Sequence, residues 1–333
     1  MTILVTGAAG FIGRSLCENL LLQGQEVVGV DNLNDFYSIH LKEKRLETLS
    51  HHKNFRFEKI NLTKKELVDK LFYNSSFKYV YHLAAQAGVR LKPKELDRYV
   101  SSNISAFTNV INSTIEYSVP NFIYASSSSV YGDVESNLLS EVSTPNFPTS
   151  YYGITKLFNE HAARVLSKGT KTKTRGLRFF TVYGPMGRPD MAYFRIVSAL
   201  LTSTEFQLFG DGHIRRDFTY IDDAIQSVAL LAEQLDSISE EHSDVVNVGG
   251  GRPQTMTELI ETAEKLTGSK LHVIEMAAHS NDVQRTEADT KLIEKLTGFK
   301  PSISIEEGMA KFLEWARREG VSEYLNSWVT SSR

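Results

Sequence analysis

Short apolar runs alternate with longer amphipathic stretches through the N-terminal part of the chain. The apolar runs predict buried strands at residues 3–5, 26–31, 55–62, 79–85 and 121–125. Apolar residues at helical spacing between them predict helices at residues 14–22, 41–49, 64–72 and 98–117. Strands and helices that alternate at this rhythm are typical of a parallel, doubly wound sheet. Right-handed crossovers place the carboxyl ends of all its strands at one edge, where ligands bind.

This rhythm continues through a helix at residues 150–166 and a sixth strand at residues 177–182, and is then lost. The remainder predicts strands at residues 206–209, 217–221 and 245–248, and helices at residues 191–201, 222–235, 257–266, 290–296 and 305–318. We therefore expect an α/β fold with a Rossmann-like domain and a smaller mixed α/β substrate-binding domain. The first spans residues 1–180 plus about 217–248, and the second about 181–216 plus 249–333.

Three glycines, Gly7, Gly10 and Gly13, directly follow the first predicted strand and lead into the first helix. In this context one glycine permits a tight turn, one lets the backbone approach a pyrophosphate, and one lets helix and strand pack closely. The helix N-terminus offers free N–H groups to the phosphates. Asp31 ends the second strand, where its carboxylate can bind an adenosine ribose and repel the extra phosphate of NADP. The pattern therefore predicts NAD as cofactor.

Composition narrows the class of protein further. A chain of 333 residues suggests about two domains, and a net charge of −3 gives no electrostatic basis for binding nucleic acid. The single cysteine, Cys17, lies on or near an apolar helix face, so neither a disulfide nor a thiolate metal site is expected. No apolar run is long enough to span a bilayer, and no signal peptide precedes the first strand. We expect a cytoplasmic protein without membrane partners.

Tyr152 and Lys156 are four residues apart, hence on one face of a predicted helix. An ammonium beside a phenol favours the phenolate and should lower the pKa of Tyr152. A phenolate can remove the proton of a sugar or alcohol hydroxyl. The serine run 126–129, after the fifth strand, can hold the same substrate oxygen. Such a Tyr-Lys pair is also frequent on solvated helix faces, but the glycine motif and the serine run favour an active site.

These motifs resemble those of the NAD-dependent sugar-nucleotide epimerases of the extended short-chain dehydrogenase/reductase family. The likeness covers essentially the whole chain and includes the stretch from Arg216 to Asp223. It implies that Tyr152 is the catalytic base, that Lys156 binds the cofactor and that Ser127 is the hydroxyl partner, with Ser129 as the alternative. It also implies a homodimer, formed by the helix that carries Tyr152 and the helix at residues 98–117.

The expected cofactor site combines the glycine turn, the ends of the following strands and the active-site helix. Its residues are Gly7, Gly10, Phe11, Ile12, Gly13, Asp31, Asn32, Asn61, Leu62, Leu83, Ala84, Ala85, Gln86, Asn103, Tyr152 and Lys156. The expected substrate site, implied by the resemblance, consists of Ser127, Ser129, Thr181, Arg188, Arg216 and Asp282. In relatives an Asp commonly stands at the position of Asn61, and galactose epimerases place an Arg before the counterpart of Asp282, which residues 278–281 lack.

The serine run also separates related activities. Sugar-nucleotide 4,6-dehydratases carry an Asp-Glu pair at the positions of Ser128 and Ser129, and UDP-glucuronate decarboxylases carry a Glu at the latter. The stretch from Thr181 to Phe194 looks most like that of the UDP-glucuronate 4-epimerases. This likeness implies that Arg188 clamps the sugar carboxylate, work that suits a planar guanidinium. Binding a phosphate or capping a loop is the other interpretation of Arg188.

The reaction implied is transient oxidation of UDP-glucuronate at C4, followed by reduction of the 4-keto sugar from the opposite face to give UDP-galacturonate. The principal alternative is a 4-epimerase of the UDP-glucose/galactose type, or of an N-acetylated sugar. A related NAD-dependent reductase and a non-catalytic nucleotide-binding module are the remaining alternatives. Intact Ser127, Tyr152 and Lys156 argue against the module.

Overall fold

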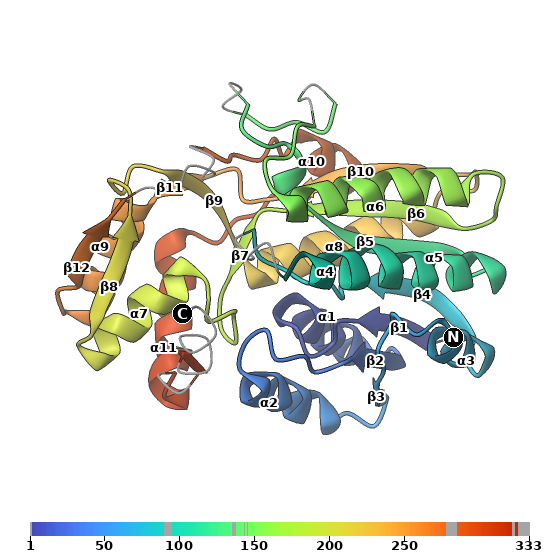
Figure 1. The fold of residues 1–333 in the computed structure, drawn as a ribbon, viewed down its shortest axis with the longest axis horizontal. Coiled ribbons are helices and arrows are strands. Elements are labelled where there is room, and N and C mark those ends of the chain that lie inside the picture. Colours follow the sequence, from blue (N-terminus) through green and yellow to red (C-terminus); the bar gives the residue numbers. More distant parts are fainter. Residues whose placement is uncertain are drawn as a thin grey trace.

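A seven-stranded parallel sheet forms the larger part of the molecule, with strand order β10-β6-β5-β4-β1-β2-β3 (Figure 1). The computed structural model describes residues 2–89, 95–134, 138–142, 144, 146–277, 285–321 and 324–325. The strands are β1 (Thr2–Thr6), β2 (Val27–Asp31), β3 (Phe55–Lys59), β4 (Phe77–His82), β5 (Asn121–Ser127), β6 (Lys173–Phe179) and β10 (Ser243–Val248). The predicted doubly wound α/β fold is confirmed.

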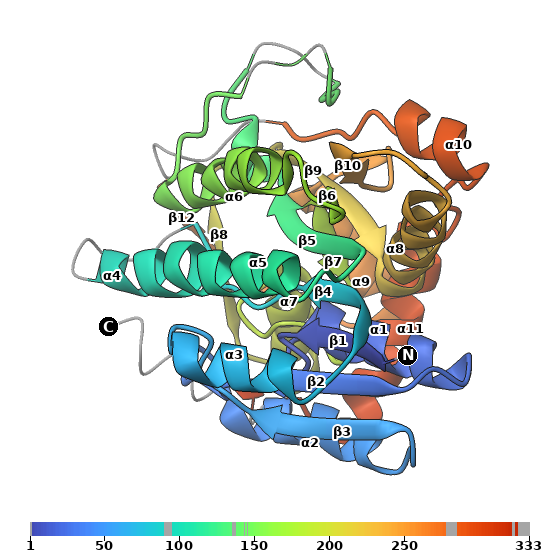
Figure 2. The same cartoon turned by 90° about the vertical axis from the view of Figure 1, so that its right-hand side faces the viewer.

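Helices cover both faces of this sheet (Figure 2). One layer contains α1 (Phe11–Leu22), α2 (Ile39–Ser50) and α8 (Ile221–Asp236), and the other contains α3 (Lys65–Tyr73), α5 (Ala106–Glu116) and α6 (Tyr151–Ser167). Successive side chains of a strand point to opposite faces, so β1 supplies two cores. Ile3 and Val5 join the core under α1, whereas Leu4 joins the core under α3 and α5.

Two predicted elements are interrupted, and both interruptions fall near the expected site. The helix predicted at residues 98–117 consists of α4 (Leu96–Tyr99), a π-helical segment η2 (Val100–Ser105) and α5. The sixth strand ends at Phe179 and is followed by the separate strand β7 (Thr181–Tyr183). Between them, the Phe180 amide donates to the carbonyl of Val248, which extends the contact with β10 by one residue before the chain leaves the main sheet.

The smaller part of the molecule surrounds two short sheets, ordered β11-β9-β7 and β12-β8. Its strands are β7, β8 (Glu205–Phe209), β9 (Arg215–Tyr220), β11 (Pro253–Thr255) and β12 (His272–Met276). Its helices are α7 (Ala192–Thr202), α9 (Met256–Thr267) and α11 (Ile305–Glu319). Aromatic side chains of α7 and α11 pack together here, and they continue the core that lies under α1.

The chain returns to the main sheet through α8 and β10, which pairs with β6. The start of the stretch 217–248 does not return with them, because β9 pairs with β7 and β11. Helix α10 (Lys291–Thr297), expected in the smaller domain, packs against α8 and β10. The division of the chain into two domains remains a prediction. Strand β9 crosses its proposed boundary at residue 217, and α10 packs on elements assigned to the first domain.

No helix in the described ranges is long and apolar enough to cross a membrane. The cytoplasmic location expected from the sequence remains a prediction.

Candidate active site

The glycine turn joins β1 to α1 at the carboxyl edge of the main sheet. Gly7 has a φ of +74°, and a Cβ on it would lie 2.8 Å from the amide nitrogen of Ala84. A Cβ on Gly13 would lie 2.0 Å from the carbonyl oxygen of Gly7. Side chains at these two positions are therefore excluded by sterics. Gly10 caps α1 without a side-chain hydrogen bond, which leaves the first amides of the helix for an anionic ligand.

Asp31 lies at the end of β2, next to this turn. One carboxylate oxygen accepts from the amide of Ala9 at 3.2 Å and the other accepts from the amide of Leu33 at 2.9 Å. The carboxylate thus holds the glycine turn and the loop after β2 together. Asn32 is exposed, and its side chain accepts from the amide of Asn34.

The next strands bring their predicted cofactor residues to the same edge. Ala84 donates its amide to the hydroxyl of Thr6, which ties the end of β4 to that of β1. Asn103, in the π-helical segment η2, is buried and bonds both the amide and the carbonyl of Gln86. Its amide also donates to Thr155 on α6. Asn103 therefore joins the loop after β4 to the active-site helix.

The remaining predicted cofactor residues lie along these same segments. Asn61 is exposed and accepts from the amide and hydroxyl of Thr63, while Leu62 is buried and its carbonyl accepts from Asn109. Phe11 and Ile12 begin α1, and Leu83 and Ala85 follow β4. Their role in binding the cofactor remains a prediction.

Tyr152 and Ser127 meet where α6 passes the end of β5. The hydroxyl of Ser127 lies close enough to the phenol of Tyr152 to lower its pKa, and it lies 3.2 Å from the hydroxyl of Ser129. Burial raises the pKa of Tyr152, while the positive charge of Arg188 and the Ser127 hydroxyl act in the opposite direction. The structure brings together the predicted base, both candidate hydroxyl partners and Arg188.

Lys156 lies one helical turn after Tyr152 and is buried beneath the end of β5. Its Nζ donates to the carbonyl of Ala125 at 2.8 Å and lies 5.8 Å from the centre of the Tyr152 ring. Burial lowers the pKa of Lys156 to about 8, although the carboxylate of Glu160 opposes this shift. Burial of the phenol is the largest influence on the pKa of Tyr152, and Arg188 and Ser127 act against it. The expected effect of Lys156 on this pKa remains a prediction.

A buried ion pair under the active site was missed at the level of sequence. Glu160 accepts from both Nε and Nη2 of Arg178 at 2.8 Å, and from the hydroxyl of Ser126 at 2.5 Å. Glu160 follows Lys156 by one helical turn, and Arg178 interrupts the apolar pattern of β6. A charged residue inside an apolar strand is the signal that could have identified this pair.

Arg188 lies in the loop between β7 and α7 and is paired with Asp190. Its Nη2 and Nε contact the two oxygens of Asp190 at 2.6 and 3.1 Å. Although burial disfavours the charge, this carboxylate holds the pKa of Arg188 above its ordinary value. The pair fixes the orientation of the guanidinium, whose side chain remains 23% exposed. Its Nη1 makes no hydrogen bond within the described part of the chain, so it is available to a ligand.

The other predicted substrate residues are distributed over the smaller sheet. Thr181 begins β7, and Arg216 lies on β9, where its Nη1 donates to the carbonyl of Arg215. Asp282 and residues 278–281 lie outside the described residues. Their predicted role therefore remains a prediction.

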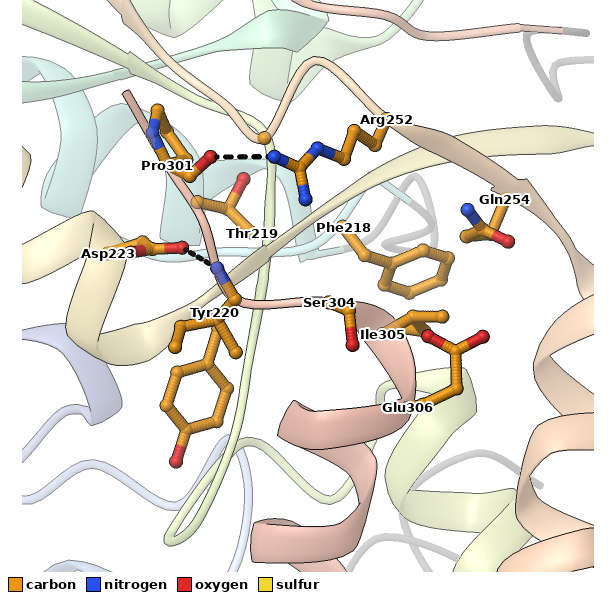
Figure 3. Close-up of a pocket in the computed structure, with 12 residues that line it drawn as sticks. Phe218, Thr219, Tyr220, Asp223, Arg252, Gln254, Pro301, Ser304, Ile305 and Glu306 are labelled. Atoms are coloured by element: carbon orange, nitrogen blue, oxygen red, sulfur yellow. Dashed lines mark hydrogen bonds between the residues drawn. The ribbon is translucent and has the colours of Figure 1, made fainter. Parts of the chain in front are cut away.

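A cavity of about 170 Å³ lies between β9 and the start of α11 (Figure 3). Arg252 reaches the carbonyl of Pro301 at its rim, and Asp223 accepts from the amides of Ser302 and Ile303. None of the predicted site residues that the structure describes lines this cavity. It is therefore separate from the cluster around Tyr152.

Comparison with known proteins agrees with this geometry. A model of the NAD dependent epimerase/dehydratase family matches residues 3–249. A probable UDP-glucuronate 4-epimerase from Rhizobium meliloti is 36% identical over an alignment of 329 residues. The match covers 95% of this chain and 96% of that protein. The Bacillus cereus UDP-glucuronic acid 4-epimerase in complex with UDP-glucuronic acid and NAD has a TM-score of 0.88 and 33% identity, covering 96% of this chain and 99% of that one.

A UDP-glucose 4-epimerase of Thermotoga maritima, solved with UDP-glucose, is also similar. Its TM-score is 0.86 at 28% identity, and the match covers 96% of this chain and 99% of that one. The resemblance seen in the sequence is confirmed. Because epimerases of both a uronate and a neutral hexose share the fold, the substrate has to be argued from side chains.

Replacing the phenol tests the assigned base. Tyr152→Phe keeps the buried ring and removes only the hydroxyl, so we expect an unchanged melting temperature and turnover reduced by about 10²–10⁴-fold, the usual contribution of general acid–base catalysis. The neighbouring Tyr151→Phe on the same helix is the matched control and should retain activity. Near-normal turnover of the Tyr152 variant would exclude the phenol as the base.

Proposed function

Because the chain belongs to the NAD-dependent epimerase/dehydratase family, we propose that it interconverts UDP-glucuronate and UDP-galacturonate by epimerisation at C4. The observation that carries the choice of substrate is the position of Arg188. Its positive charge acts on the pKa of Tyr152, and its Nη1 has no partner among the described residues, so the guanidinium can bind the carboxylate of a sugar held by the proposed base.

The residues of the glycine turn fit NAD. The space that a Cβ would need at Gly7 and Gly13 is filled by backbone, and the uncapped start of α1 is suited to a pyrophosphate. Asp31 favours a free ribose hydroxyl over a phosphate at the same position. When bound, NAD accepts the hydride from C4 of the sugar and returns it.

The proton follows a route built from this chain's own side chains. Tyr152 removes the proton of the sugar 4-hydroxyl, and Ser127 holds the same oxygen through its hydroxyl. Ser129 lies within hydrogen-bond distance of Ser127 and orients it. After the 4-keto sugar has turned over, Tyr152 returns the proton to the oxygen of the epimer.

Arg188 has a second task with a uronate. The 4-keto form of a glucuronate is a β-keto acid, which loses carbon dioxide when its carboxylate bond stands perpendicular to the carbonyl plane. A guanidinium fixed by Asp190 can hold the carboxylate away from that orientation. The serines at positions 128 and 129, in place of the acids of dehydratases and decarboxylases, agree with simple epimerisation.

Arg188→Ala separates a uronate epimerase from a hexose epimerase. We expect kcat/KM for UDP-glucuronate to fall by about 10–100-fold, the effect of losing a charged hydrogen bond of about 1.5–3 kcal/mol. Turnover of UDP-glucose should change less, since it has no carboxylate. Some UDP-glucuronate should now be decarboxylated. Chromatography of the products from both substrates, in the wild type and the variant, gives all three readouts.

If kcat/KM fell equally for the two substrates, Arg188 would instead bind a phosphate or stabilise the loop. The hexose alternative would then be preferred. Arg195→Ala, which removes an arginine of α7 whose guanidinium stacks on Phe206, is the control for a general loss of positive charge.

A homodimer is part of the same proposal. Helix α6 exposes apolar side chains along one stripe: Ile154 is 51% exposed, Phe158 40% and Val165 67%. Tyr117, at the end of α5, is 39% exposed beside this layer of helices. Pairing α5 and α6 with their copies about a two-fold axis would cover these side chains.

Phe158→Glu should convert this dimer to a monomer, because it places a charge in the centre of the apolar stripe. Leu22→Glu, on the exposed side of α1, is the matched control and should leave the oligomer unchanged. Light scattering at micromolar concentration measures both. A monomeric wild type would contradict the proposal.

A further inference from the structure

Arg45 lies on α2, a helix rich in charged residues, yet its side chain is completely buried. Its guanidinium makes five hydrogen bonds, to four groups. Nη1 donates to the carbonyl of Ala9 and to the hydroxyl of Tyr37. Nε and Nη2 donate to the carbonyl of Met186, and Nη2 also donates to that of Gly187. One side chain therefore joins the glycine turn to the loop that carries Arg188.

All of these described acceptors are neutral. A buried charge costs free energy unless it is well compensated, and the usual partner is a carboxylate. Arg45 instead uses the fork of its guanidinium to bind carbonyls of two segments that are far apart in sequence. This use of a guanidinium depends on its planar geometry, which a lysine cannot reproduce.

The loop that Arg45 holds is strained. Met186 has a φ of +57°, a left-handed conformation that a side chain with a Cβ seldom adopts. Its carbonyl receives two of the hydrogen bonds from Arg45, at 2.9 and 2.6 Å. The strained residue lies two positions before Arg188. The hydrogen bonds thus stabilise a conformation of the loop that determines where Arg188 points.

The other end of the connection reaches the cofactor residues. The peptide of Ala9 is held on both sides, with its N–H bonded to Asp31 and its carbonyl to Arg45. Tyr37 supports the same guanidinium, which lies over its ring at 5.3 Å. A continuous series of hydrogen bonds therefore runs from Asp31 through Ala9 and Arg45 to the substrate loop.

We infer that Arg45 is a positioning residue that sets the place of Arg188 and thereby the preference of the enzyme for a uronate. The inference rests on the carboxylate role proposed for Arg188. Arg45 gives its five hydrogen bonds to groups of the protein itself, so its effect on the sugar carboxylate should act through Arg188. A residue with a merely structural role would weaken binding of every UDP ligand to the same degree.

The test compares dissociation constants of UDP-glucuronate and UDP for the NAD-loaded protein. In Arg45→Met, the dissociation constant of UDP-glucuronate divided by that of UDP should rise by about three- to thirtyfold. This is the size of effect expected for energetic coupling between neighbouring residues. Arg45→Lys, which keeps the charge without the fork, should change this ratio less. Arg14→Met should leave the ratio unchanged: Arg14 ties α1 to α2 through Thr48, and no hydrogen bond described for it reaches the loop of Arg188.

The same substitution of Arg45, made in the Arg188→Ala variant, shows whether Arg45 acts through Arg188. There, Arg45→Met should alter the ratio by less than about twofold, since the residue it positions is gone. An equal effect in both backgrounds, or an unchanged ratio in Arg45→Met and Arg45→Lys, would overturn the inference while leaving the proposed function intact. If Arg188→Ala itself leaves the ratio unchanged, the proposed substrate fails, and the inference fails with it. Should Arg45→Met not fold, the same comparison is made with Arg45→Lys.

Discussion

A buried carboxylate, that of Glu160, fixes the active-site helix against the main sheet. It binds Arg178 on β6 through both oxygens and accepts from Ser126 at the end of β5. Tyr152, Lys156 and Glu160 follow one another at intervals of four residues on α6, so fixing the last also sets the direction of the first two. Removing one partner of such a buried pair costs about 3–5 kcal/mol. The contact between Tyr152 and Ser127 depends on this anchor.

Burial sets the charges of the site in the absence of ligand. It raises the pKa of Tyr152 and lowers the pKa of Lys156 to about 8, so burial disfavours the charge of each group, although a lysine with this pKa is still mostly charged at pH 7. Arg188 opposes the shift of the phenol, although Asp190 offsets part of its charge. The protein alone therefore keeps the phenol protonated, and further lowering of its pKa has to come from groups bound during turnover. In the proposed reaction the same arginine acts on both the base and the substrate carboxylate.

Much of the fold and part of the site could be predicted because they depend on local pattern. The alternation of strands and helices predicts the parallel sheet, and the three glycines with Asp31 predict the turn at its carboxyl edge. Tyr152, Lys156 and Ser127 converge as expected since each lies on a regular element. The structure differs from the prediction where contacts between distant segments determine the conformation. Strand β9 pairs outside the main sheet, and a π-helical segment interrupts the helix around Asn103.

Buried charges were the hardest feature to predict. Charged side chains ordinarily indicate positions exposed to solvent. Three of them are nevertheless buried: Lys42 and Arg45 on α2 and Arg178 on β6. In α2 the buried positions are Leu41, Lys42, Arg45 and Leu49, so the two charged residues share the face of the leucines. That spacing was visible in the sequence. The partners of Arg45 in the loop of Arg188 were not, because the backbone carbonyls of Met186 and Gly187 carry no sequence signal.

The fate of the hydrogen at C4 tests the central claim most directly. UDP-glucuronate labelled with deuterium at C4 is incubated with the enzyme in ordinary water, and the separated UDP-galacturonate is analysed by mass spectrometry and NMR. Transient oxidation within one closed site predicts an epimer that retains deuterium at C4. Loss of the label to water, or absence of the epimer among the products, would contradict the account.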